Sequence, residues 1–252
     1  MSHALVELQK LGVEVDLIDL SVAEDRPTVQ PCRGCISTAG GYHCHYPCDC
    51  YLRKDEDEDE APDFLAEHRV FERVAKADGF MVFTPVNWYS VPTQVKAMFD
   101  RFVCTSLTLT REQAHDLMGA DVKDPKLTRP LSMSGEHDDM LKNQWAGKKA
   151  AFYIHGDDGA ADYKDRKEPK SLRMYPDAKS PVEPVRMAIL PIVQQCRYSG
   201  IDVPDDLIVS FYFNKGLDYA SANDAFRDST QAFSLAKSLA QRLVHSIESA
   251  KG

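Results

Sequence analysis

An unbroken apolar strand is the feature that most constrains the fold of this chain. The run Gly79-Phe-Met-Val-Phe-Thr-Pro85 shows no alternation of apolar and polar residues. We therefore expect it to be buried on both faces, as the strands of parallel sheets are. A helix is predicted directly after it, over residues 90–102, because Val95, Met98, Phe99 and Phe102 form one apolar stripe.

The same alternation of strand and helix recurs along the whole chain, and it predicts a parallel sheet between two layers of helices. The expected helices cover residues 2–12, 62–77, 182–198 and 222–249, and the further expected strands cover residues 13–20, 149–155 and 207–213. A helix ahead of the first strand is unusual for this class. We expect a further strand upstream, with Met1 an internal methionine of a longer protein.

Composition and charge narrow the classes of function. The net charge is −9, which argues against a nucleic-acid partner because such binding needs clustered Lys and Arg. No apolar run approaches the ~20 residues that span a bilayer, and no secretion signal is present. We expect a cytoplasmic protein with one domain over residues 1–252, carrying a cysteine-rich loop (31–51) and two polar insertions (104–147 and 157–180). One helix is predicted within the first insertion, over residues 110–118.

Five of the seven cysteines fall in the cysteine-rich loop: Cys32, Cys35, Cys44, Cys48 and Cys50. The odd total and the missing export signal argue against a disulfide framework. The spacing provides enough thiolates for a four-ligand site, either an iron–sulfur cluster or zinc. The alternative is that one or two thiols contact the functional site and the others are free. The remaining two, Cys104 and Cys196, are predicted to be core residues.

Two loops stand out as the place for a ligand. Parallel sheets of this class bind ligands at the carboxyl ends of their strands. Small polar, glycine and aromatic side chains gather just past two predicted strands, over residues 84–89 and 155–159. Both loops are therefore predicted to lie in the functional site.

The stretch from Ala77 to Arg101 resembles the third strand, loop and helix of the NADPH-dependent FMN reductase family. The resemblance rests on an Ala-Asp-Gly entry, then Thr-Pro-Val, an aromatic loop, a proline, and a lysine followed by Asp-Arg. The run Pro31-Cys-Arg-Gly-Cys35 is also similar to that family, including its iron–sulfur flavoprotein relatives. The resemblance implies a flavodoxin-like three-layer fold whose first strand and phosphate-binding loop are missing from this chain.

The resemblance also implies an FMN-dependent oxidoreductase that takes a hydride from NADH or NADPH. The acceptor would be a quinone, a flavin, a nitro compound or a metal, and the protein would be a homo-oligomer. The residues expected around FMN are Thr84, Pro85, Val86, Asn87, Trp88, Tyr89, His155, Gly156 and Asp157. Ordinary loop packing is the alternative for the aromatic pair, and a hydrogen bond to a backbone carbonyl for the histidine. The alternative function is a non-catalytic metal-binding or redox-sensing module built on the cysteine loop.

Overall fold

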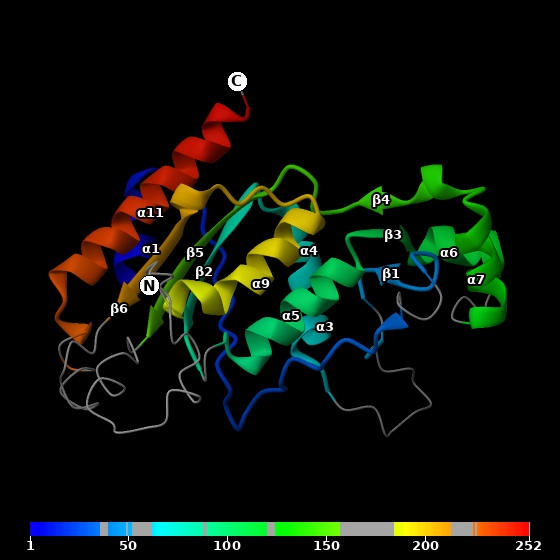
Figure 1. The fold of residues 1–252 in the computed structure, drawn as a ribbon, viewed down its shortest axis with the longest axis horizontal. Coiled ribbons are helices and arrows are strands. Elements are labelled where there is room, and N and C mark those ends of the chain that lie inside the picture. Colours follow the sequence, from blue (N-terminus) through cyan, green and yellow to red (C-terminus); the bar gives the residue numbers. More distant parts are fainter. Residues whose placement is uncertain are drawn as a thin grey trace, which may run out of the picture.

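A three-stranded parallel sheet forms the centre of the computed structural model (Figure 1). The structure describes residues 1–35, 40–48, 50–51, 62–87, 90–119, 124–156, 184–212, 224 and 226–251. The strands are β2 (Gly79–Pro85), β5 (Lys149–Gly156) and β6 (Ile208–Tyr212), in the order β2-β5-β6. The parallel sheet and its helices confirm the predicted flavodoxin-like α/β fold.

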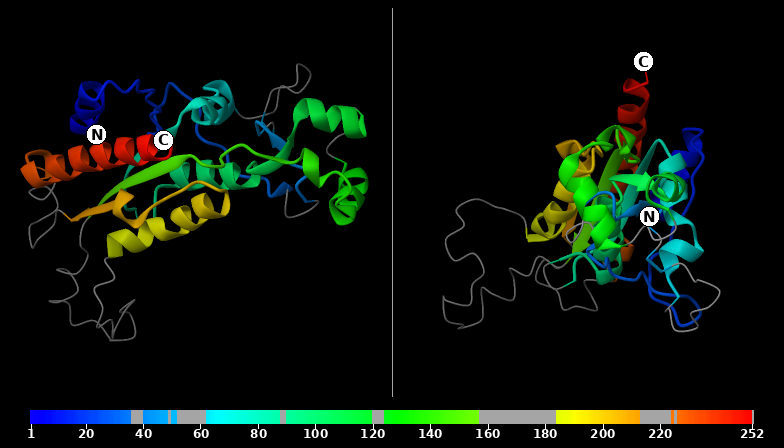
Figure 2. Two further views of the ribbon diagram at one scale, coloured as in Figure 1. Left: turned by 90° about the horizontal axis from the view of Figure 1, so that it is seen from above. Right: turned by 90° about the vertical axis from the view of Figure 1, so that its right-hand side faces the viewer.

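Side chains of β5 alternate between two apolar cores, one on each face of the sheet. Phe152 and Ile154 pack into one core, whereas Ala151 and Tyr153 pack into the other. The helices that supply these cores are α5 (Thr93–Cys104) and α9 (Pro184–Tyr198) on the first face, and α1 (Ser2–Lys10) and α11 (Thr230–Ser249) on the second. Figure 2 shows α1 and α11 on the opposite side of the sheet from α9. We call the sheet with these four helices the sheet body.

Two predicted helices differ from the observed ones at identifiable residues. The helix expected over residues 62–77 is divided into α3 (Phe64–Glu67) and α4 (Val70–Lys76). Between them Arg69 has a φ of 50°, and such a left-handed residue cannot continue an α-helix. The last helix begins only at Thr230, because the Ser229 side chain accepts the Ala232 N–H and caps it there.

The strand expected over residues 13–20 is not formed, and β2 is not buried on both faces. A strand is defined by a neighbour that exchanges backbone hydrogen bonds with it, and none pairs with residues 13–20 in the described chain. The segment instead lies in an irregular conformation, held by Arg73, whose Nε donates to Asp16 Oδ2 at 2.8 Å. Residues 79–83 of β2 remain partly exposed. Within the described residues β2 is an edge strand that pairs only with β5.

The first polar insertion forms a lobe with more secondary structure than the one helix predicted for it. We define the lobe as residues 40–48, 107–119 and 124–143. Its elements are β1 (His45–Tyr46), β3 (Leu107–Thr110), α6 (Arg111–Met118), α7 (Pro125–Ser134), the 3₁₀ turn η1 (Asp138–Met140) and β4 (Lys142–Asn143). The helix predicted at residues 110–118 is confirmed as α6, where Thr110 and Gln113 form a capping box. The second insertion, residues 157–180, lies outside the described residues.

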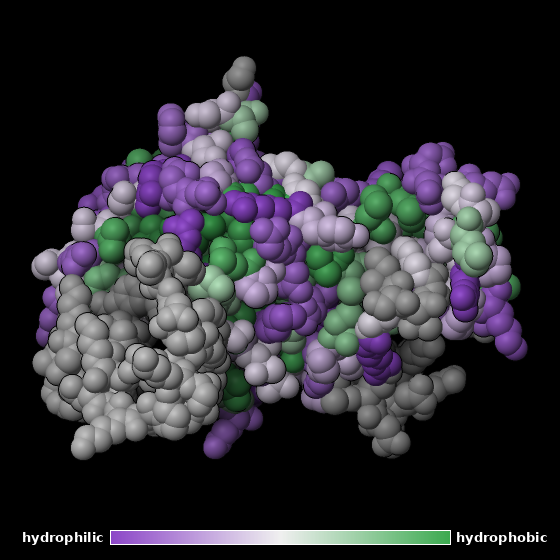
Figure 3. Space-filling view, in the orientation of Figure 1, coloured by the Kyte–Doolittle hydropathy of each residue, from purple (hydrophilic) through white to green (hydrophobic). Residues whose placement is uncertain are grey.

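Trp145 lies where the chain passes from the lobe back to the sheet body. Its side chain is fully buried, it stacks on Phe102 at a centroid distance of 4.7 Å, and its Nε1 donates to the Phe102 carbonyl at 2.9 Å. The visible surface mixes hydrophilic and hydrophobic residues over both parts (Figure 3). Of the helices that the structure describes, none has the length and apolar composition needed to cross a membrane.

Candidate functional site

The described parts of the two predicted ligand loops, residues 84–87 and 155–156, lie side by side where β2 and β5 end. Pro85 is paired with His155 in the register of the two strands, and the Val86 N–H donates to the His155 carbonyl at 2.9 Å. Asn87 and Ser90 exchange two backbone hydrogen bonds, at 2.8 and 3.1 Å. This pair closes a narrow turn, and residues 88–89 connect its two sides.

Some of the residues predicted to bind FMN support the loop, and others are exposed and can contact a ligand. Thr84 is fully buried and its Oγ1 donates to the Pro85 carbonyl at 3.1 Å, so its side chain supports the loop and does not reach a ligand. Pro85 and Asn87 are exposed at the edge. Trp88, Tyr89 and Asp157 lie outside the described residues.

His155 is the titratable side chain of this edge. Its ring stacks on Phe226 at a centroid distance of 4.8 Å. Burial, together with the positive charge of the chain's amino terminus, lowers the pKa of His155 to about 4. The imidazole is therefore neutral at pH 7.

The cysteines of the loop gather at another place, where α5 ends and the lobe begins. The Cys32 and Cys104 sulfur atoms are 3.4 Å apart, and those of Cys35 and Cys50 are 3.6 Å apart. The prediction that Cys104 is a core residue is wrong, since its side chain is partly exposed and faces another thiol. The same prediction is confirmed for Cys196, which is fully buried. No local spacing could have revealed a partner 72 residues away.

The thiol pair is distant from the carboxyl edge of the sheet. Helix α5 begins at Thr93, just after the β2 loop, and ends at Cys104. Eleven helical rises of 1.5 Å separate the two ends by about 16 Å. Within one chain, Cys32 and Cys104 therefore do not contact the loops predicted to bind a flavin.

The described residues give no support to an iron–sulfur or zinc site. They contain no group of three or more His, Cys, Asp or Glu side chains that could hold a metal ion. Two of the five proposed ligands, Cys44 and Cys48, are buried. The other three, Cys32, Cys35 and Cys50, are partly exposed and take part in the two sulfur–sulfur contacts.

A buried ion pair beside the thiols was not foreseen from the sequence. The Arg101 Nη1 donates to Asp63 Oδ1 at 2.7 Å, and both side chains are fully buried. Asp63 also caps α3 by accepting the Ala66 N–H at 3.1 Å. The Nε and Nη2 of Arg101 are buried and have no hydrogen-bonding partner among the described residues. The only hint of this ion pair in the sequence is Arg101 itself, which ends the family-like segment from Ala77 to Arg101.

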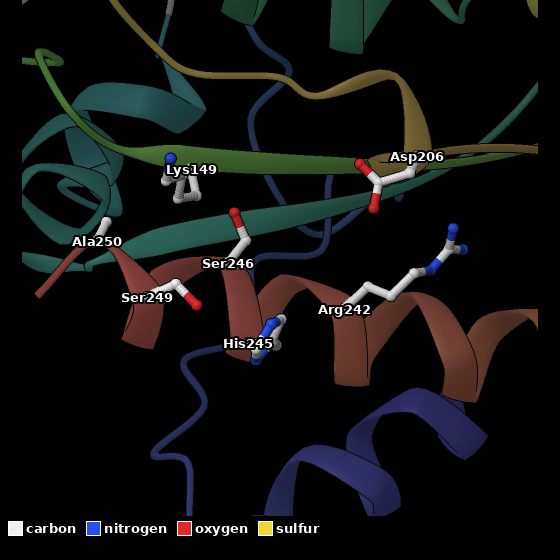
Figure 4. A pocket seen from close by; sticks show the side chains of 7 residues that line it. All are labelled: Lys149, Asp206, Arg242, His245, Ser246, Ser249 and Ala250. Carbon is white, nitrogen blue, oxygen red and sulfur yellow. The ribbon is translucent and has the colours of Figure 1, made fainter. Parts of the chain in front are cut away.

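A hollow of about 380 Å³ lies at the opposite end of the strands from the two loops (Figure 4). Its lining comes mainly from the end of α11, with Arg242, His245 and Ser246, and from Lys149 at the start of β5. Six strand residues of about 3.3 Å each separate Lys149 from His155, a distance of about 20 Å. The hollow is therefore not part of the edge formed by the two loops.

Comparison with known proteins agrees with this geometry. A family model described as NADPH-dependent FMN reductase matches residues 1–120. That range includes α1, the cysteine-rich loop, β2 with its following loop, and α5. No curated protein matches the chain. Residues 1–120 are thus similar to the NADPH-dependent FMN reductase family, whose members have a flavodoxin-like fold.

Proposed function

We propose that the protein is an FMN-dependent oxidoreductase that takes electrons from NADH or NADPH and passes them to a small acceptor. The observation that carries this proposal is the hydrogen bond from Val86 N–H to the His155 carbonyl. It joins the loop inside the family-matched range to the end of β5. Two loops at the carboxyl ends of adjacent parallel strands are the ordinary place for a nucleotide-type cofactor in such sheets.

The residues at this edge fit a flavin. Asn87 is exposed beside the strand ends and can offer its side-chain amide, and the aromatic residues Trp88 and Tyr89 follow it in the sequence. An aromatic side chain there would cover a flat ring. When bound, FMN would supply the hydride chemistry, and the protein would position it.

The geometry of His155 is compatible with this assignment. Its ring stacks on Phe226 at a centroid distance of 4.8 Å, which fixes the plane of the ring beside the strand ends.

The proposal also covers the electron acceptor, the oligomeric state and the cellular location of the protein. We expect the acceptor to be a small molecule such as a quinone, a free flavin, a nitro compound or a metal ion. A homo-oligomer in the cytoplasm is expected as well. The rival is a non-catalytic metal-binding or redox-sensing module built on the cysteine loop. The described residues hold no group of side chains that could bind a metal ion, whereas the contact between the Cys32 and Cys104 sulfur atoms is what a redox-sensing module would need.

The test is nicotinamide oxidation with and without added FMN, using benzoquinone as the acceptor. We expect NADPH or NADH to be consumed only when protein, FMN and acceptor are all present. Heat-denatured protein and free FMN at the same concentration are the controls. The proposal is wrong if the native protein, shown to be folded by circular dichroism, gives no more oxidation than free FMN.

A further inference from the structure

We propose that Cys32 and Cys104 form a redox-active thiol pair that exchanges with small disulfides and closes a Cys32–Cys104 disulfide. This site is separate from the flavin edge and does not depend on the proposed function. About 16 Å of α5 lies between the two places.

The contact between the two sulfur atoms carries the proposal. They are 3.4 Å apart, so each must move only slightly to reach the bond length of about 2.05 Å that a disulfide requires. Cys104 is the last residue of α5, and Cys32 lies in an irregular segment. Neither residue sits in the interior of a helix or strand, so the approach does not break regular structure.

The surroundings distinguish the two thiols. The Cys32 thiol donates to the Cys104 sulfur, and the Cys32 sulfur accepts a hydrogen bond from the Gly34 N–H at 3.3 Å. The thiol of Cys104, the Gly34 N–H and the charge of Arg101 lower the pKa of Cys32 to about 6, against burial and Asp100. The hydrogen bond to Cys32, followed by burial, raises the pKa of Cys104. The Gly34 N–H that points at the Cys32 sulfur can also stabilise a thiolate there, whereas Cys104 ends α5 and has Cys32 as its thiol neighbour; we therefore assign Cys32 as the attacking thiol and Cys104 as the resolving thiol.

The Arg101 guanidinium is a second reason to expect a thiolate at Cys32. Arg101 is fully buried beside this cluster, and two of its donor nitrogens have no hydrogen-bonding partner among the described residues. Its ion pair with Asp63 uses only Nη1. The charge of Arg101 favours the thiolate form of Cys32, although Arg101 interacts more strongly with Cys48.

The chemistry is thiol–disulfide exchange. The Cys32 thiolate attacks one sulfur of a small disulfide RSSR, forming a Cys32–SR mixed disulfide and releasing RS⁻, which takes up a proton. Cys104 then loses its proton and attacks the Cys32 sulfur, releasing the second thiol. The two protein thiols are oxidised by two electrons, and RSSR is reduced to two RSH.

The other thiols give an internal comparison. Cys35 and Cys50 are 3.6 Å apart and are also partly exposed. Cys44, Cys48 and Cys196 are buried, and burial of the thiol raises the pKa of Cys196 to about 12. Reaction at Cys32 before any of these is the specific expectation.

The experiment begins with the unmodified full chain, fully reduced and free of oxygen. It is treated with bis(2-hydroxyethyl) disulfide, a neutral small disulfide, then alkylated and digested. Peptide mass mapping at increasing times should show a Cys32–Cys104 crosslink as the first product. This measurement needs no variant. If a Cys35–Cys50 crosslink or a scatter of mixed disulfides forms first, the proposal is overturned.

Variants then separate the two roles. Cys104→Ser should accumulate a stable mixed disulfide on Cys32, because no resolving thiol remains. Cys32→Ser should leave Cys104 unmodified over the same period. Cys35→Ser and Cys196→Ser are the matched controls and should form the Cys32–Cys104 crosslink at the parental rate. Crosslinking of Cys104 to another cysteine in folded Cys32→Ser would contradict the assignment of Cys32 as the attacking thiol.

Discussion

In the sheet body, buried apolar side chains lie on both faces of the central strand, whereas the lobe has a small apolar core supplemented by polar contacts. The central strand β5 is buried along almost its whole length. In the lobe, the apolar core is a cluster around Tyr42, Leu109 and Ala114. Hydrogen bonds supplement it, joining His43 to Thr128 at 2.9 Å and Tyr42 to Asp138 at 2.9 Å.

This difference in packing corresponds to the two proposed sites: the flavin site is in the sheet body, and the thiol pair is beside the lobe. The sheet body fixes two loops at the carboxyl ends of its strands through a register of parallel pairs, which suits the positioning of a cofactor. The thiols lie where α5 meets the lobe. There, short strands and polar contacts leave partly exposed sulfur atoms close to one another. Each prediction below tests one side of this comparison or the junction between them.

The largest effect is expected at the junction, for Asp63→Asn. This change removes the partner of a fully buried guanidinium, which typically costs about 3–5 kcal/mol of unfolding free energy. The matched control is Asp16→Asn, which breaks the more exposed ion pair with Arg73 and should cost about 0–1 kcal/mol. Chemical denaturation of both variants provides the comparison. Equal losses of unfolding free energy in the two variants would show that the buried Arg101–Asp63 pair does not stabilise the junction.

The next prediction concerns whether the lobe unfolds independently of the sheet body. Leu109→Ala removes a fully buried side chain from the small apolar cluster of the lobe and should cost about 2–5 kcal/mol. We expect amide hydrogen exchange to accelerate in β3 and α6, and to remain slow in β5. Phe152→Ala, in the core of the sheet body, should instead accelerate exchange throughout the chain. Uniform loss of protection in both variants would mean that lobe and body form one cooperative unit.

A smaller effect is expected from pH. The folded state keeps His155 neutral down to pH about 4, while the unfolded chain takes up a proton below about 6.5. Stability is therefore fully present above pH 6.5 and falls as the pH decreases to about 4, by at most about 3 kcal/mol. His155→Gln should flatten this part of the stability curve, and His115→Gln, on exposed α6 surface, should not. A parental slope in His155→Gln would contradict the burial of a neutral imidazole.

Local patterns in the sequence predicted the elements whose stability is local or strongly apolar. The strands at residues 79–85 and 149–155 were foreseen because each is a compact apolar run, and α5 because its stripe has helical spacing. The segment 13–20 could not be judged in this way, because a strand also needs a partner far away in the chain. The break at Arg69 is a single backbone angle with no clear residue signal.

Distant contacts explain why only part of the candidate site was predictable. The pairing of Pro85 with His155 followed from the general geometry of parallel sheets. The Cys32–Cys104 contact and the Arg101–Asp63 pair join residues 72 and 38 positions apart. No spacing rule connects residues so far apart. Side-chain composition predicted a thiol-rich loop, but only the fold shows which thiols meet.

The measurement that tests the central claim most directly is FMN titration by fluorescence quenching. We expect the parent to bind FMN. Trp88→Ala should weaken binding by roughly 2–12-fold, corresponding to about 0.5–1.5 kcal/mol of lost ring stacking. Asn87→Ala should lose a similar amount, equivalent to about one hydrogen bond. The control Asn143→Ala, at an exposed position in the lobe, should bind like the parent. The account is contradicted if neither Trp88→Ala nor Asn87→Ala changes FMN affinity, or if both only lower the melting temperature of the protein.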